Sequence, residues 1–562
     1  MGSIVSTLGL GGKWVPAQEQ RRHIAYRICA GFKNNTAGRN IDTPDIEHRQ
    51  YGDPSMINDL VVDGMLSEKL AFVVAGSQHP QEPDLGERPL DPEASDGPAE
   101  ARLARAKQER HDIKAAQAVE SWELALEQYD RATVVADWLD GWVVAEDVRS
   151  KIWETEREFA VPLGDGVVVL GWNSETGRPS LTVYPPESYF PVIETDARKF
   201  PTKVHLAWEE PGDNGLSEYL HRTTYELGPI IGEDGQSLSR ELPWGEITSQ
   251  TCFVESKRWP IGNSNNWMKL DPTAAEVVTP RTDLGFNFIP VVHIPNTPSS
   301  TFHYGRSVYA VVAQLFDDIA AFDKDMAAAS ALAATPMFAI EGGNLPAGYS
   351  VKAGAIWPLQ AGSKPHKIDV SANLTPLLEY EARLNERLAT NSRVGQTIMG
   401  RSSASSGASG YRVKLDMTPF EQMIDMMRMV RKNKYSLIFK FAQRIAMYGE
   451  QLEAGDDARI NIDFGPAVPA DTKTEIELVK SLLSPPAAIS RLTASRMLQA
   501  AGVPLEDVDA ELSRIVSEDF DGADDIASAV SQDAAAAYLG VDGPGQPPIP
   551  GTELPGVVLD GI

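Results

Sequence analysis

The sequence has few cysteines and no long apolar run. Cys29 and Cys252 are its only cysteines in 562 residues, and neither belongs to a Cys-x-x-Cys pattern. We interpret them as reduced, buried thiols of a cytosol-type compartment. Because no stretch of about 18 apolar residues occurs, the sequence predicts no membrane-spanning helix. Gly2 and Ser6 fit the myristoylation pattern, but so short a pattern often arises by chance.

Positive charge is also scarce. The net charge of −28 argues against a protein that binds nucleic acid over a general basic surface, because such affinity comes from neutralising phosphates. It does not exclude a protein that lets nucleic acid pass. An acidic wall repels phosphates and would keep a moving strand from sticking.

Catalytic motifs are absent from the sequence. There is no GxxxxGK[ST] loop for phosphates, no HExxH, and no GxSxG in the one Ser/Gly-rich stretch. Neighbouring carboxylates such as Asp317 and Asp318 point in different directions on a helix. We therefore expect no catalytic residue, no metal site and no cofactor, and a protein that is not an enzyme.

The first 300 residues predict a mixed α+β fold with helices first and a mostly antiparallel sheet after them. Helical periodicity occupies residues 14–30, 55–74 and 99–158. The Pro-, Gly- and acid-rich segment 77–98 predicts a loop or disorder. Runs of β-branched and aromatic residues, broken by Gly and Pro, predict strands in residues 164–172, 174–193, 203–208, 221–227, 250–256 and 286–293.

Two helices that bracket a small β insert come next. Residues 305–335 carry apolar positions at spacings of 4, 3, 4, 3 and 4, which predicts one helix with an apolar stripe. The insert at 336–372 holds Gly and Pro turns between short apolar runs, and a second helix at 373–392 can return alongside the first. The expected packing positions are Val308, Val312, Leu315, Ile319, Phe322, Met326, Leu377, Leu384 and Leu388.

The remainder of the chain is a Ser/Gly-rich loop followed by helices. Residues 393–417 lack apolar periodicity, so mobility is expected. Thr418, Pro419 and Glu421 form a capping box with proline at the first helical position, which predicts a helix over 418–455. We expect the cations of that helix to lie at a solvated or subunit-facing surface; they are Arg428, Arg431, Lys432, Lys434, Lys440 and Arg444.

In the order of these elements the chain resembles the portal proteins of tailed bacteriophages. The resemblance is carried by GDGVVVLGW with YPPESYFPV, by FIPVVHIPN before YGRSVYAVVAQLFDDIAAFDKDM, by the insert ending in Asp369, by SSASSGASG, and by ISRLTASRMLQAAGV with DVDAEL. Each string alone is weakly specific, whereas their order and spacing extend over most of the chain.

The resemblance implies a portal fold with six parts and a tail. These are an α/β wing (1–304), an antiparallel two-helix stem (305–335 and 373–392), a small β clip (336–372), a tunnel loop (393–417), a long wing helix (418–455), a helical crown (456–537) and a flexible tail (538–562). It implies a homo-oligomeric ring, dodecameric in the mature virion, at one capsid vertex. Double-stranded DNA would be packaged and ejected through this ring.

The resemblance also implies partners and site residues. The partners are the terminase large subunit, head-completion or adaptor proteins, the major capsid protein and the scaffold, with assembly in the host cytoplasm. Candidate channel residues in the tunnel loop are Arg393, Arg401, Ser402, Ser405, Ser406, Ser409 and Arg412. Candidate docking residues in the clip are Lys352, Lys364, His366 and Lys367.

Two alternatives stay open. The first is another virion ring or adaptor protein that binds partners without conducting DNA. The second is an enzyme whose Ser/Gly loop closes an active site, against which the missing catalytic motifs argue.

Overall fold

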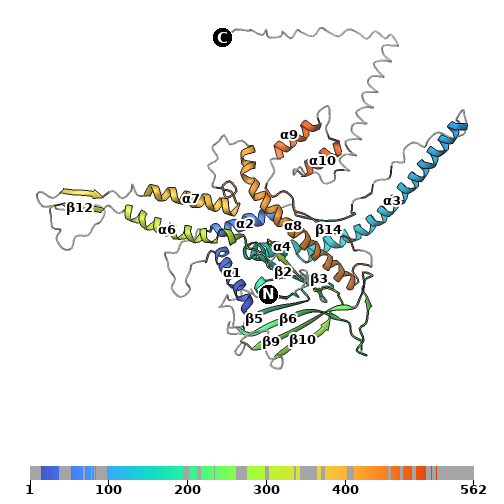
Figure 1. Ribbon diagram of the computed structural model, residues 1–562, viewed down its shortest axis with the longest axis horizontal. Coiled ribbons are helices and arrows are strands. Elements are labelled where there is room, and N and C mark those ends of the chain that lie inside the picture. Colours follow the sequence, from blue (N-terminus) through green and yellow to red (C-terminus); the bar gives the residue numbers. More distant parts are fainter. Residues whose placement is uncertain are drawn as a thin grey trace, which may run out of the picture. The chain divides into compact units, whose positions relative to one another are not determined.

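The chain folds into a mixed helix-and-sheet protein with two compact units, Met1–Val468 and Pro469–Ile562 (Figure 1). The computed structural model describes residues 14–36, 52–67, 70–77, 79–80, 83, 98–193, 201–211, 217–232, 234–260, 275–297, 303–334, 337–341, 364–368, 374–400, 410–453, 457–468, 472–483, 489–500, 508 and 514. The α+β class expected from the sequence is confirmed.

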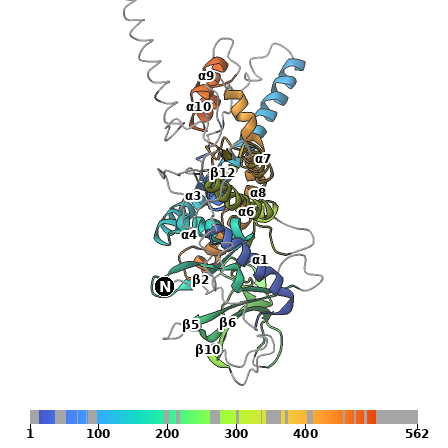
Figure 2. The same ribbon diagram turned by 90° about the vertical axis from the view of Figure 1, so that its left-hand side faces the viewer.

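The sheets of the first unit are antiparallel. One has five strands in the order β10-β9-β6-β5-β4, and a second has three in the order β11-β2-β3. The five-stranded sheet lies below helices α4 and α8 in the views of Figures 1 and 2. The strands are β1 (Ala71–Val74), β2 (Asp165–Asn173), β3 (Arg178–Tyr184), β4 (Tyr189–Val192), β5 (Lys203–Pro211), β6 (Ser217–Pro229), β7 (Arg240–Glu241), β8 (Ile247–Thr248), β9 (Gln250–Pro260), β10 (Glu276–Asp283), β11 (Val291–Pro295), β12 (Met337–Glu341), β13 (Lys364–Ile368) and β14 (Ile460–Asp463).

Strand β2 is the centre of this architecture because it is buried on both faces. Val168 and Leu170 belong to the main core, whereas Val167 and Val169 belong to a second core against the five-stranded sheet. Successive side chains of a strand point to opposite faces, so the continuous apolar run GVVVL supplies both cores at once.

The strand predictions differ from the structure at β11 and at β10. Residues 286–290 precede β11 and are not part of it, although Phe286 and Phe288 are buried. Strand β10 was missed, because seven of its eight residues are exposed and its sequence shows no alternation of apolar and polar residues.

The helices are α1 (Ala17–Lys33), α2 (Asp53–Leu66), α3 (Pro98–Ala145), α4 (Val148–Glu154), α5 (Val161–Leu163), α6 (Ala313–Ala334), α7 (Leu374–Ser392), α8 (Gly410–Tyr448), α9 (Thr472–Leu483) and α10 (Arg491–Ala500). A π-helix, η2 (Thr155–Ala160), joins α4 to α5, and 3₁₀ turns lie at η3 (Pro186–Ser188) and η7 (Val308–Val311).

Three helix predictions need correction. The helix expected over 55–74 ends at Leu66, and the residues after Leu70 form β1, which pairs with β14 almost 400 positions away. The helix expected over 99–158 is interrupted at Asp147, whose φ is 51°. The helix start expected at Thr418 is wrong, because α8 begins at Gly410 and contains Pro419. Pro419 has no N–H to donate to the carbonyl of Leu415, four residues earlier. Leu415 is exposed, so water can bind this carbonyl.

The second unit contains α9 and α10, which pack against each other. Val479 of α9 and Ala494 of α10 are buried. The backbone N–H of Thr493 donates to the Ser490 hydroxyl at 3.2 Å, so Ser490 caps the start of α10.

Candidate functional site

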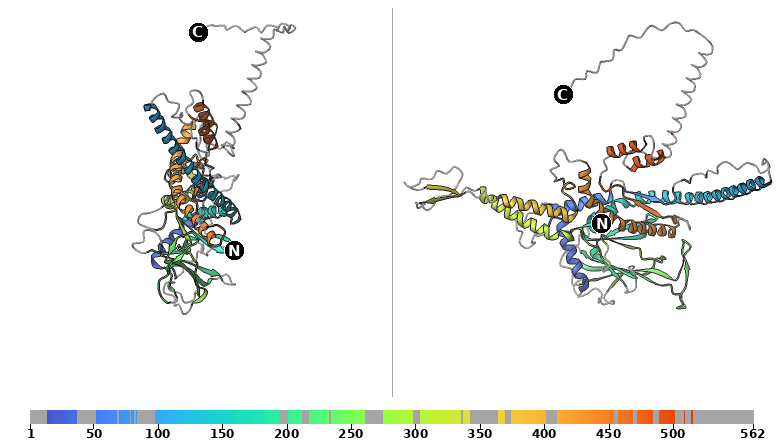
Figure 3. Two further views of the ribbon diagram at one scale, coloured as in Figure 1. Left: turned by 90° about the vertical axis from the view of Figure 1, so that its right-hand side faces the viewer. Right: turned by 45° about the horizontal axis from the view of Figure 1, so that its top comes forward.

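Helices α6 and α7 lie side by side (Figures 1 and 3). At one end, the pair and the η7 turn that leads into α6 are anchored in the protein interior. Val308 and Val312 are buried there together with Leu388, and Leu384 is also buried. These four predicted packing positions are therefore core positions of the single chain.

The predicted stripe loses its phase at the start of α6. Leu315 is only partly buried, whereas Phe316 is buried and packs against the rings of Phe32 and Tyr309, with centroids 5.3 and 5.9 Å away. The cause is η7, which has the tighter 3₁₀ winding of about three residues per turn and rotates the following helix relative to an uninterrupted α-helix.

The other end of the pair is different. No residue from 317 to 330 of α6 is buried, although Ile319, Phe322 and Met326 lie in this stretch. The Phe322 ring meets the Tyr380 ring edge-on at 5.2 Å. Leu378 of α7 remains 57% exposed, and Leu377 is half-buried. Two helices that expose this much apolar surface have room for a further apolar neighbour.

A two-stranded antiparallel sheet follows α6 and precedes α7. Strand β12 pairs with β13 so that Lys364 lies opposite Glu341, His366 opposite Ala339 and Lys367 opposite Phe338. Lys364 is exposed. Of the four predicted docking residues, the structure therefore places three on one strand, and Lys352 lies outside the described residues.

Only two of the seven predicted channel residues lie in the described part of the chain, so their arrangement stays a prediction. Arg393 is exposed and has a φ of 61° just after α7 ends. Arg412 lies in the first turn of α8, where only the backbone is described. The other five, Arg401, Ser402, Ser405, Ser406 and Ser409, lie outside the described residues.

Helix α8 holds a buried ion pair that the sequence did not reveal. Arg431 Nε lies 3.0 Å from Glu156 Oε1, and Nη2 lies 2.9 Å from Oε2; both side chains are fully buried. Arg431 also donates to the Asn296 carbonyl at 2.7 Å and to its side-chain oxygen at 2.8 Å. The Tyr435 hydroxyl donates to Glu156. Burial by itself lowers the pKa of Arg431, but the Glu156 carboxylate outweighs it and raises that pKa.

A second cation of α8 is buried without a carboxylate partner in its hydrogen-bond set. Arg428 donates to the carbonyls of Gly64 at 2.7 Å and Met65 at 3.0 Å, in the last turn of α2, and to that of Gly465 at 2.7 Å. Carbonyls in a last helical turn have no intrahelical donor, so the guanidinium satisfies them and binds α8 to α2. The expectation that the cations of α8 lie at a surface is wrong for Arg428 and Arg431, because both are on the buried face of α8.

A buried carboxylate fixes the turn that leads towards α6. Asp165 accepts hydrogen bonds from Tyr26 at 2.5 Å, from His293 at 2.7 Å and from the backbone N–H of Gly305 at 2.7 Å. Burial alone would raise the pKa of Asp165, but these donors hold it below its usual value. A Cβ at Gly305 would lie 2.3 Å from the carbonyl oxygen of Gly164, so this position requires glycine.

These buried polar groups have structural roles that their partners explain. Within the described part of the chain, no group of three histidines, cysteines or carboxylates is placed to hold a metal ion. The described helices also include none that is both long and apolar enough to span a bilayer. Cys29 and Cys252 are both free thiols, and burial raises the pKa of each.

Comparisons with known proteins give structural likenesses only. No protein-family model matches the chain, and no curated protein matches it. A chain from the neck of an empty GTA particle, computed with C6 symmetry, has a TM-score of 0.35 at 14% identity and covers 62% of this chain and 77% of its own. A chain from the native GTA neck, computed with C12 symmetry, has a TM-score of 0.35 at 15% identity, with coverages of 63% and 80%.

A third similar chain belongs to the virion of a native gene transfer agent particle. Its TM-score is 0.38 at 13% identity, and it covers 79% of this chain and 89% of its own. Likenesses at these scores carry no argument about function, so the proposal below rests on the residues of this chain.

Proposed function

We propose that this chain is the subunit of a homo-oligomeric portal ring in a phage-like virion, through which double-stranded DNA is packaged and later ejected. The observation that carries the proposal is the α6–α7 pair. Its apolar positions are buried at the core end, whereas none is buried from 317 to 330. An apolar surface of this kind is stabilised by a neighbour, and closed rings supply the same neighbour to every copy.

The other parts take roles from the same arrangement. Strands β12 and β13, with Lys364, His366 and Lys367, form the clip that docks the terminase large subunit during packaging and head-completion proteins afterwards. Residues 393–417, the tunnel loop, face the DNA. The last part of this segment, from Gly410 on, forms the first turns of α8. The acidic composition of the chain keeps a sliding duplex from adhering to the wall.

Ring formation is tested by a variant that leaves the single chain intact. Leu378→Asp places a charge at a side chain that is 57% exposed in the monomer, so the fold should tolerate it, whereas burial against a neighbouring subunit should not. We expect wild-type protein to form large rings in mass photometry and electron micrographs, and the variant to shift towards monomers.

The matched control is Ile113→Asp on α3, where an equally apolar side chain is 55% exposed outside the α6–α7 pair. It should assemble as wild type does. A wild-type chain that stays monomeric at every concentration, or a Leu378→Asp variant that assembles like the control, would contradict the ring. A ring whose centre is closed would instead favour an adaptor protein that does not conduct DNA.

A further inference from the structure

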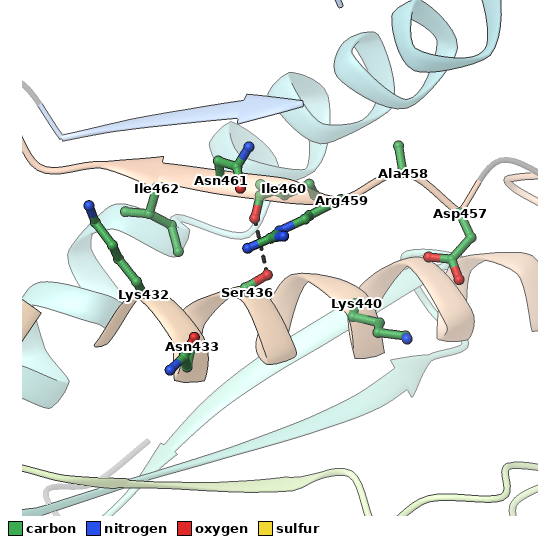
Figure 4. Close-up of a pocket in the computed structure, with 10 residues that line it drawn as sticks. All are labelled: Lys432, Asn433, Ser436, Lys440, Asp457, Ala458, Arg459, Ile460, Asn461 and Ile462. Atoms are coloured by element: carbon green, nitrogen blue, oxygen red, sulfur yellow. Dashed lines mark hydrogen bonds between the residues drawn. The ribbon is translucent and has the colours of Figure 1, made fainter. Parts of the chain in front are cut away.

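A basic groove lies between α8 and β14, and none of its lining residues has a role in the portal proposal. It has a volume of about 610 Å³. Figure 4 shows Lys432 and Lys440 near opposite ends of the α8 side, with Ser436 between them, and Arg459 on the segment that leads into β14. These three cations are exposed, and the lining contains only one carboxylate, that of Asp457.

The charge of the groove opposes that of the chain. Its lining carries three positive groups against one negative group, on a protein with a net charge of −28. Within the described residues, no carboxylate lies at ion-pair distance from Lys432, Lys440 or Arg459, although Glu246 outside the lining is near enough for the charge of Lys440 to help lower its pKa. Lys432 and Lys440 are two helical turns apart on one face of α8, or about 12 Å along its axis, so they can contact two separate anionic groups of an extended ligand.

The groove is better suited to a ligand bound by side chains than to a peptide that adds a strand to β14. One edge of β14 pairs with β1. On the α8 side, the Ser436 hydroxyl donates to the Ile460 carbonyl at 3.1 Å, and the Gln443 amide donates to the Ala458 carbonyl at 3.0 Å. These bonds occupy carbonyls that strand addition would need.

The groups that remain are hydrogen-bond donors suited to phosphate. Two ammonium groups and a guanidinium line the groove, together with the exposed amides of Asn433 and Asn461. Lysine binds phosphate as a point charge, and the planar guanidinium of arginine binds it through two parallel hydrogen bonds. The apolar residues Ile460 and Ile462 of the lining are buried, so the groove exposes little apolar surface to a ligand.

We propose that this groove binds the phosphate backbone of a nucleic acid. Its lining residues lie outside the tunnel loop in the sequence, and the site lets a chain that is acidic overall hold DNA at one defined place. The inference rests on the proposed function only for the choice of DNA as the ligand. Binding to the groove can be measured whether or not the protein assembles into rings.

The test is fluorescence anisotropy of a labelled 20-base-pair duplex against full-length protein over a range of salt concentrations. Each phosphate neutralised contributes about 0.9 to the slope of log K against log salt, so three contacts predict about a 40-fold loss of affinity between 50 and 200 mM salt. The triple variant Lys432→Gln, Lys440→Gln, Arg459→Gln should remove that slope and bind at least 10-fold more weakly at 50 mM.

The matched control removes the same charge elsewhere. Lys107, Arg110 and Lys114 are exposed on α3, and their triple glutamine variant should bind as wild type does. Asp457→Asn takes a negative charge out of the groove and should tighten binding by about 2- to 4-fold, as expected for one like charge a few ångströms away in a water-like medium.

Three outcomes would overturn the proposal. These are equal binding by the groove and control variants, no duplex binding by wild type at 50 mM salt, and preferential binding of a polyglutamate peptide at the groove, which would assign it to an acidic protein segment. Ring assembly is followed separately by mass photometry, so a ring without groove binding refutes this site alone, and groove binding without a ring refutes the portal proposal alone.

Discussion

The Arg431–Glu156 pair lets the energetics of the first unit be tested through one change. Glu156→Gln keeps the shape of the side chain but removes the negative charge that faces a fully buried guanidinium. Breaking a buried pair from one side costs about 3–5 kcal/mol, because the remaining charge has no compensation. We expect the variant to lose that much unfolding free energy, and Arg431→Met to lose a similar amount.

The double variant Glu156→Leu, Arg431→Met gives the decisive comparison. Independent costs would add to about 6–10 kcal/mol. We expect it to be no less stable than either single variant, because no unpaired charge remains. The cost that remains in the double variant comes from the Tyr435 hydroxyl and Asn296, which lose their hydrogen-bond partners, at about 1–3 kcal/mol for each buried group.

Urea unfolding followed by tryptophan fluorescence is the appropriate assay. All 11 tryptophans lie before residue 469, so the signal reports on the first unit alone. Samples are compared at one protein concentration, because assembly changes apparent stability. A Glu156→Gln cost below about 1 kcal/mol, or additive costs in the double variant, would refute the idea that this pair is a coupled buried charge pair.

Two further predictions concern stability. Arg428→Met removes the donors to the last-turn carbonyls of α2 and should lower the free energy of unfolding by about 2–4 kcal/mol. The control Arg110→Met, on the exposed face of α3, should leave the free energy of unfolding almost unchanged. Equal urea midpoints for the two variants would contradict the capping role. Burial lowers the pKa of His23, His205 and His303 to about 3. Protonation of these histidines therefore favours the unfolded chain. The free energy of unfolding should be highest above about pH 6.5 and should fall towards pH 3, by at most about 1.4 kcal/mol per histidine per pH unit. His205→Gln should flatten this dependence in urea titrations at pH 7, 6 and 5, and an unchanged slope would contradict it.

The sequence by itself determined much of the local structure. The apolar run of β2 and the helix α1 were predictable, because each depends on residues a few positions apart. The helical stretches on either side of the β12–β13 insert were also legible from spacing alone. What periodicity conveys is which face of an element is apolar, and that information is local.

The tertiary structure decided what distant residues do to one another. Arg431 reads as one more surface cation until Glu156, 275 positions earlier, is placed against it. Residues 71–74 look helical until β14 offers a strand partner, and Phe316 replaces Leu315 in the core only because η7 turns the helix first. The groove of Lys432, Lys440 and Arg459 likewise exists only where α8 meets β14. Charge pairing, strand pairing and helix phase depend on partners brought together by folding, and no window of neighbouring residues contains them.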